Sequence, residues 1–182
     1  MKRFLLAVCV LFVVQSCIPL RIAPNIEDYK VATGKKFKRS LSKRKMFIFE
    51  DPKDPNHFYD YVNIKYQLED ENVYDDVPFK INGQQYFFSF YEVDIPDKTI
   101  NFFNFFFSHA LSAALNSEDD NDAVPEEIRK ENYYLAIEVY NDIEKDCLDD
   151  NSLSREVVLK YLRALKEEYL STHNYNEVVF KN

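Results

Sequence analysis

The stretch that decides the fold is Val77-Pro78-Phe79-Lys80-Ile81-Asn82-Gly83-Gln84-Gln85-Tyr86-Phe87-Phe88-Ser89-Phe90-Tyr91-Glu92-Val93-Asp94-Ile95. Apolar residues recur on both sides of Asn82-Gly83. That dipeptide favours a type I′ turn, because both central residues of such a turn need φ > 0. The stretch therefore predicts a β-hairpin. The return strand carries apolar side chains on both faces, so we expect it inside a sheet and covered on both sides. Pro78 lacks a backbone donor, which predicts an edge position for its strand or a nitrogen turned outward.

Other strands are expected on either side of this hairpin. The apolar run 46–49 is followed by Glu50-Asp51-Pro52, which predicts a buried strand and a turn. Residues 133–140 alternate in the manner of a strand, and Val178 and Phe180 suggest a short last strand over 176–181.

Three stretches predict helices. Asp54 and Pro55 form a helix-start signature for a helix over about 54–67. Residues 153–170 have the apolar stripe of an amphipathic helix. Residues 99–115 are rich in phenylalanine and alanine and also suggest a helix, followed by an acidic loop to about 131. We therefore expect a single α+β domain over 46–182, with a mainly antiparallel sheet of four or five strands and about three helices.

The N-terminal segment has the features of an export signal. Lys2 and Arg3 precede an unbroken apolar run of 11 residues, 4–14, which is too short to cross a bilayer. The run ends in Val14-Gln15-Ser16-Cys17, which resembles the lipobox of bacterial lipoproteins. The resemblance implies a thioether-linked lipid on Cys17 and removal of residues 1–16. The alternative is an ordinary secretory signal that happens to end beside a cysteine.

The whole chain resembles the small lipoproteins of Bacteroidetes, especially flavobacteria, in its lipobox, its Lys/Asn/Tyr/Phe-rich composition and segments such as 46–52. The resemblance implies no activity, but it does suggest a location. Surface-exposed lipoproteins of that phylum tend to have acidic residues just after the lipidated cysteine. Ile18-Pro19-Leu20-Arg21 has none, so we expect a position on the outer membrane that faces the periplasm.

Charge is distributed unevenly along the chain. Residues 21–45 hold nine basic and two acidic residues, a net of +7, whereas residues 46–182 have a net of −17. We interpret 17–45 as a basic tether, which is either a solvated spacer or a segment resting on anionic lipid head groups. The acidity of the remainder argues against a nucleic-acid partner.

Catalytic and metal-binding motifs are missing from the sequence. Two glycines, Gly34 and Gly83, leave no phosphate-binding loop, and the acidic runs 119–122 and 142–146 lack the glycine and glutamate that an EF-hand requires. His57, His109 and His173 are widely spaced, so we expect no metal and no cofactor. Cys147 is expected to be a partly buried free thiol.

One feature suggests a binding surface. Phe102, Phe103, Phe105, Phe106 and Phe107 form an aromatic cluster, which either fills the core or contacts a protein or lipid. The leading hypothesis is a lipid-anchored, non-enzymatic accessory module that binds an envelope protein. The alternatives are a carrier or sensor of an apolar ligand, with a pocket lined by Phe87, Phe103 and Tyr133, and an envelope hydrolase.

Overall fold

A computed structural model of the chain describes residues 17–20, 23–53, 56–101 and 126–177. The chain divides into two compact units, one comprising Met1–Pro24 with Ile95–Asn132 and the other comprising Asn25–Asp94 with Tyr133–Asn182. Each unit has its own antiparallel sheet.

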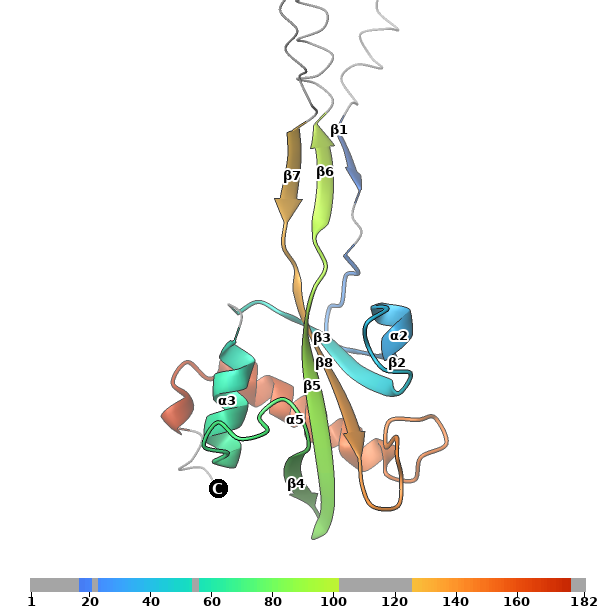
Figure 1. The fold of residues 1–182 in the computed structure, drawn as a ribbon, viewed down its shortest axis with the longest axis vertical. Helices are drawn as coiled ribbons and strands as arrows, with labels where there is room; N and C mark the ends of the chain where they lie inside the picture. Colours follow the sequence, from blue (N-terminus) through green and yellow to red (C-terminus); the bar gives the residue numbers. More distant parts are fainter. Residues whose placement is uncertain (1–16, 21–22, 54–55, 102–125, 178–182) are drawn as a thin grey trace, which may run out of the picture. The chain divides into compact units, whose positions relative to one another are not determined.

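The larger unit is built on a five-stranded sheet in the order β2-β3-β8-β5-β4 (Figure 1). Every neighbouring pair in this sheet is antiparallel. Three helices belong to the same unit, and together they confirm the predicted α+β class. The strands are β2 (Lys30–Thr33), β3 (Lys45–Asp51), β4 (Val77–Ile81), β5 (Gln84–Asp94) and β8 (Tyr133–Tyr140); the helices are α2 (Gly34–Phe37), α3 (His57–Tyr66) and α5 (Arg155–Ser171).

The predicted hairpin is confirmed. Strands β4 and β5 pair with Ile81 opposite Gln84, and the turn residues Asn82 and Gly83 have φ of 51° and 82°. Strand β4 lies at the edge of the sheet, as Pro78 predicts, and β5 lies inside it next to β8.

One face of the sheet carries an aromatic core. Helices α3 and α5 pack on this face through residues at helical spacing, as predicted, and Phe58 is fully buried against Phe90 and Tyr169 at centroid distances of 4.8 and 4.9 Å. Burying large aromatic side chains stabilises a core strongly, at about 3–5 kcal/mol for a Phe that is truncated to Ala. The sheet residues of this core are Phe47, Phe49, Val77, Phe79, Tyr86, Phe88, Phe90, Leu135, Ile137 and Val139.

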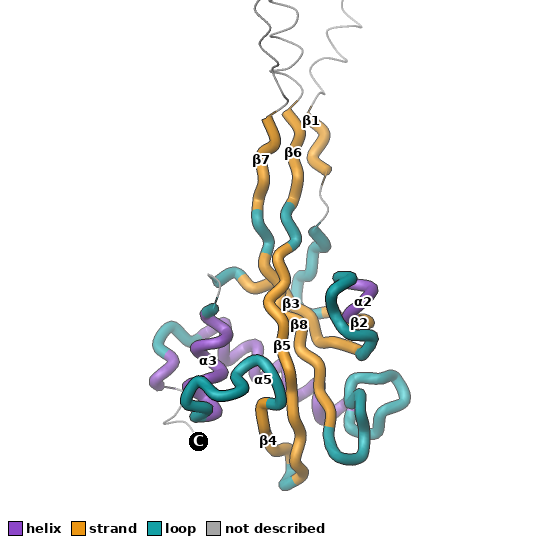
Figure 2. Tube along the Cα trace, viewed as in Figure 1, coloured by secondary structure: helices purple, strands orange, loops and turns teal. Residues whose placement is uncertain are grey.

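The opposite face is covered by the segment that follows β2. Helix α2 and the turn after it bring Phe37 against Tyr134, with ring centroids 5.4 Å apart, and Leu41 is buried. Alternate β8 residues Tyr134, Ala136 and Glu138, which point to this face, are also buried. Figure 2 shows the coil, helix and strand of this segment as one continuous stretch.

Residues 30–45 correct the predicted tether. They form β2, α2 and the start of β3, because Val31 pairs with Phe47 and the residues after it return to the sheet. A basic composition gave no sign of this strand.

The described residues of the smaller unit form a sheet of three strands in the order β1-β6-β7: β1 (Cys17–Leu20), β6 (Asp97–Asn101) and β7 (Glu126–Lys130). Strand β6 corrects the start of the predicted 99–115 helix, and β7 corrects the end of the predicted 116–131 loop. Both strands exist through pairing with segments distant in sequence, Cys17 with Asn101 and Asn101 with Glu126. The rest of that helix and of that loop lies outside the described residues. The predicted last strand lies largely outside them as well, and its described start is a 3₁₀ turn over 175–177.

Candidate binding groove

A groove runs between the β4–β5 turn and the N-terminal half of α5. It consists of two adjoining hollows of about 410 and 330 Å³, which share Ile81, Asn82 and Val157. The loop that joins β8 to α5 forms one wall through Ile143 and Leu153, and the other end is lined by Lys160, Tyr161 and Ala164 of α5. We call it the hairpin–α5 groove.

Three aliphatic residues of this groove are exposed. Leu153 is 96% exposed, Ile143 is 84% exposed and Val157 is 38% exposed. Single exposed aliphatic residues are common on proteins, but three that gather around one hollow are a feature of interaction sites.

The loop that carries Ile143 and Leu153 is held in one shape by side-chain acceptors. The Asn141 Oδ1 accepts hydrogen bonds from the backbone N–H groups of Ile143 and Glu144, at 2.9 and 2.6 Å. The Glu144 carboxylate accepts the N–H of Leu153 at 2.9 Å. Hydrogen bonds from the Ser154 side chain and from backbone N–H groups lower the pKa of Glu144, so this carboxylate is ionised and accepts them strongly.

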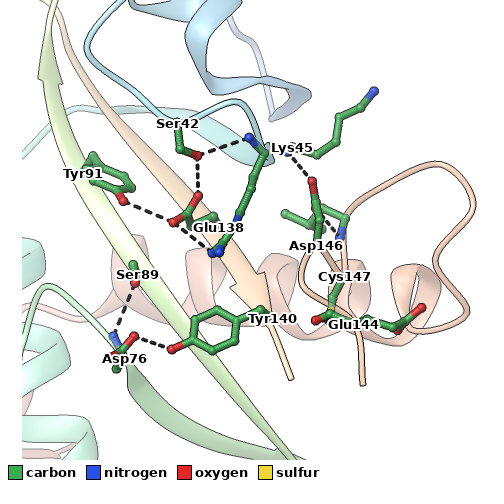
Figure 3. A network of polar contacts seen from close by, with 12 residues as sticks. Ser42, Lys45, Asp76, Ser89, Tyr91, Glu138, Tyr140, Glu144, Asp146 and Cys147 are labelled. Atoms are coloured by element: carbon green, nitrogen blue, oxygen red, sulfur yellow. Dashed lines mark hydrogen bonds and ion pairs between the residues drawn. The ribbon is translucent and has the colours of Figure 1, made fainter. Parts of the chain in front are cut away.

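Buried residues of the same loop attach it to the core. Cys147 and Leu148 are fully buried, and the N–H of Cys147 donates to the carbonyl oxygen of Val139 at 2.9 Å. Asp146 accepts the backbone N–H groups of Lys45 and Leu148 at 2.8 and 3.1 Å (Figure 3). The exposed aliphatic side chains therefore sit on a fixed support, and their exposure is not a consequence of a loose loop.

One wall residue has unused hydrogen-bonding capacity. Asn141 is 6% exposed and lines the groove, and its Nδ2 is buried with no hydrogen-bond partner. Because Oδ1 accepts two backbone donors, the orientation of the amide is fixed with Nδ2 as the free donor. A buried donor without a partner costs about 1–3 kcal/mol.

A second polar cluster, centred on Glu138, is explained by structure alone. The carboxylate is 6% exposed and accepts hydrogen bonds from the hydroxyls of Ser42 and Tyr91, at 2.6 and 3.2 Å, and from Arg44 at 3.5 Å (Figure 3). Burial and this carboxylate raise the pKa of Tyr91 to about 12, so its hydroxyl stays protonated and donates. The cluster ties residues 42–44 to the sheet.

A third cluster surrounds Lys53 at the C-terminus of α5. Its ammonium donates to the carbonyl oxygens of Tyr169 and Thr172, at 2.5 and 2.8 Å, and lies 4.3 Å from the centroid of the Tyr169 ring. Burial lowers the pKa of Lys53 and raises that of Asp51, whose carboxylate accepts the Tyr169 hydroxyl. A cation at this end of a helix satisfies free carbonyl groups and the helix dipole, so the cluster serves as a cap.

The structure bears on the predicted site residues to different extents. The aromatic cluster Phe102, Phe103, Phe105, Phe106 and Phe107 lies outside the described residues. Cys17 is the first residue of β1, so the predicted cleavage site precedes every described element. Of the predicted apolar pocket, Phe87 stacks on Tyr140 at 5.5 Å and does not line the groove. Cys147 is a buried free thiol, as expected, and burial raises its pKa to about 12.

The groove residues were not predicted. Ile143 and Leu153 are isolated aliphatic residues in a polar, acidic stretch, and that isolation was the available signal. Three of the acidic residues around them, Glu144, Asp146 and Asp149, accept backbone N–H groups, and Asp150 pairs with Lys45 and Arg155. Within the described part of the chain, His, Cys, Asp and Glu side chains do not gather in threes in a way that suits a metal ion.

Comparison of the chain with protein-family models, with curated proteins and with solved structures found no match. In the ranges that the structure describes, none of the helices combines the length and the apolar character needed to cross a bilayer.

Proposed function

We propose that this protein is a lipid-anchored module of the bacterial envelope that binds a partner protein through the hairpin–α5 groove. The lipid on Cys17 is inferred from the lipobox-like sequence, and a periplasm-facing position on the outer membrane follows from the same resemblance. The observation that carries the binding role is the exposure of Leu153 and Ile143 on a loop whose backbone is fixed by hydrogen bonds.

The placement of the apolar residues favours a protein partner over a small apolar ligand. Small-molecule sites enclose their ligand and keep their apolar side chains inside the hollow. Here Leu153 and Ile143 line the hollow. They are nevertheless the most exposed aliphatic side chains among the described residues, at 96% and 84%, so they do not enclose a ligand. Apolar side chains that project beside a hollow fit a complementary protein surface, where a few central residues contribute most of the binding energy.

The fixed loop supports the same conclusion energetically. A surface that is already in its bound shape loses less conformational entropy on association, and this raises affinity.

Site-specific photocrosslinking in source cells tests this proposal. A benzophenone amino acid at position 153 is expected to crosslink one envelope protein, and the same group at position 71, an exposed site outside the groove, is expected not to. The double variant Leu153→Ser/Ile143→Ser, assayed with the crosslinker at 157, should reduce the yield at least tenfold.

The control variant is Glu69→Ser/Glu71→Ser, which changes two exposed residues outside the groove and should leave the yield unchanged. Substitutions at such exposed positions alter stability by about 0.5 kcal/mol or less, so folding does not confound the comparison. Equal crosslinking from positions 153 and 71, or none from 153, would rule out the groove as the binding site.

A further inference from the structure

The segment that joins β2 to β3 is folded and strongly basic. Residues 35–45 contain seven Lys and Arg residues and no acidic residue. Four of them, Lys35, Lys36, Arg39 and Lys43, are exposed, and we call these four the basic surface.

The backbone beneath this surface has a defined conformation. The N–H of Gly34 donates to the carbonyl of Arg44 at 3.0 Å, and the N–H of Lys35 donates to that of Ser42 at 2.7 Å. Leu41 is 7% exposed, so the turn after α2 is packed onto the larger unit. A Cβ added to Gly34 would lie 2.6 Å from the Met46 Sδ, so the packing there is close.

The other three cations of the segment are already used within the fold. Lys38 donates to the carbonyl oxygen of Asp94, Arg44 pairs with Glu138 and Lys45 pairs with Asp150. The four residues of the basic surface form no ion pair with any residue that the structure describes. Their mutual repulsion destabilises the folded state, and none of the described carboxylates pairs with them to offset it.

We propose that the basic surface binds the anionic head groups of a phospholipid bilayer. Three of its four residues are lysines, whose ammonium groups act as compact charges on flexible stems and lack the planar fork that recognises one carboxylate. Such residues suit a diffuse field of negative charge better than a single acidic side chain, and a bilayer surface supplies that field.

The length of chain between Cys17 and the basic surface agrees with this assignment. This argument rests on the proposed lipid on Cys17. Lys35 is 18 residues from Cys17, so the chain between them spans at most about 60 Å. A lipid on Cys17 therefore limits the distance of the basic surface from the bilayer to this reach, and the two attachments add to each other as linked binding sites do.

Vesicle co-sedimentation of the full chain with Cys17→Ser, which bears no lipid, tests the surface apart from the anchor. Vesicles of 30% phosphatidylglycerol and 70% phosphatidylcholine should bind this protein at least tenfold more tightly than phosphatidylcholine alone, in about 0.1 M salt where the Debye length is about 10 Å. Lys35→Gln/Lys36→Gln/Arg39→Gln/Lys43→Gln should lose at least tenfold of that affinity.

The control carries Lys30→Gln/Lys80→Gln/Lys145→Gln/Arg163→Gln, which also removes three Lys and one Arg from exposed positions, none of them in the hairpin–α5 groove. Its binding should change less than twofold. Equal losses in both variants would show that net charge alone acts, and this result would overturn the proposal. A protein that does not bind the anionic vesicles would overturn it too. Binding to beads coated with polyglutamate, without binding to the vesicles, would indicate an acidic protein partner and would also overturn it. Neither result changes the crosslinking expected at position 153, so the two proposals fail separately.

Discussion

Truncation of Glu138 is expected to destabilise the larger unit by about 3 kcal/mol. The carboxylate accepts two well-placed hydroxyl donors, Ser42 and Tyr91, and a buried hydrogen bond to a charged group contributes about 1.5–3 kcal/mol. We take the low end for each, because both donors are half-buried and regain some contact with water in the variant. Arg44 adds little, since its contact is 3.5 Å and its side chain is 41% exposed.

Urea unfolding followed by circular dichroism measures this loss. With a slope of about 2 kcal/mol/M, Glu138→Ala should lower the midpoint by about 1.5 M. Glu138→Gln keeps the shape and one acceptor, so it should lose only about 1 kcal/mol. A double-mutant cycle with Ser42→Ala should give a coupling of at least 1 kcal/mol. A midpoint for Glu138→Ala within 0.2 M of wild type would refute the assignment of the cluster as a structural tie.

Three further predictions address the anchor, the hairpin and a buried acid. Cys17→Ala should move the protein out of the membrane fraction, and unchanged fractionation with an uncleaved signal would contradict the lipid anchor. Gly83→Val should reduce stability by more than 1 kcal/mol, because φ is +82° at this position and a β-branched residue is strained there. No neighbour lies within 4 Å of an added Cβ, so a steric clash does not contribute. A melting midpoint equal to that of wild type would contradict the backbone strain. Burial raises the pKa of Asp51 in the folded protein above its ordinary value of 3.8. The unfolded chain therefore loses this proton at lower pH than the folded protein, and the stability of wild type falls as pH rises from 3.8 through the raised pKa. Asn does not ionise, so the free energy of unfolding of Asp51→Asn should rise relative to that of wild type between pH 3 and pH 7 in parallel urea titrations. A difference between the two proteins that stays constant with pH would contradict the raised pKa of Asp51.

The elements that depend on local chemistry were predictable from the sequence. Asn82-Gly83 specifies its turn through the φ angles of two residues, and the stripe through Val158, Leu162 and Leu165 specifies α5 through one repeating face. Both features need only neighbouring residues, so composition and spacing are sufficient.

The elements that depend on distant pairing were not predictable. Strand β6 exists because Asn101 pairs with Cys17 and Glu126. Its own sequence, Asp-Lys-Thr-Ile-Asn, has one apolar residue and therefore no alternation that would indicate a strand. Strand β2 has a similar cause, since Val31 pairs with Phe47. For the same reason the 17–45 segment was interpreted as a tether.

The groove could not be predicted from the sequence for a different reason. A sequence shows that Ile143 and Leu153 are apolar, but their exposure follows from hydrogen bonds that Asn141 and Glu144 make to the loop backbone. Burial of Glu138 was missed in the same way, because its partners come from a segment far away in the chain.

Cys147 gives the protein an internal reporter of its own opening kinetics. If Cys17 carries lipid and residues 1–16 are removed, Cys147 is the single free thiol, and in the folded state it is fully buried beneath the loop that presents the groove. A neutral maleimide then reacts only when that loop lifts or the whole unit unfolds. Comparing the free energy of labelling with that of global unfolding shows whether the loop opens independently, and a partner bound at the rim should slow the labelling in proportion to its occupancy.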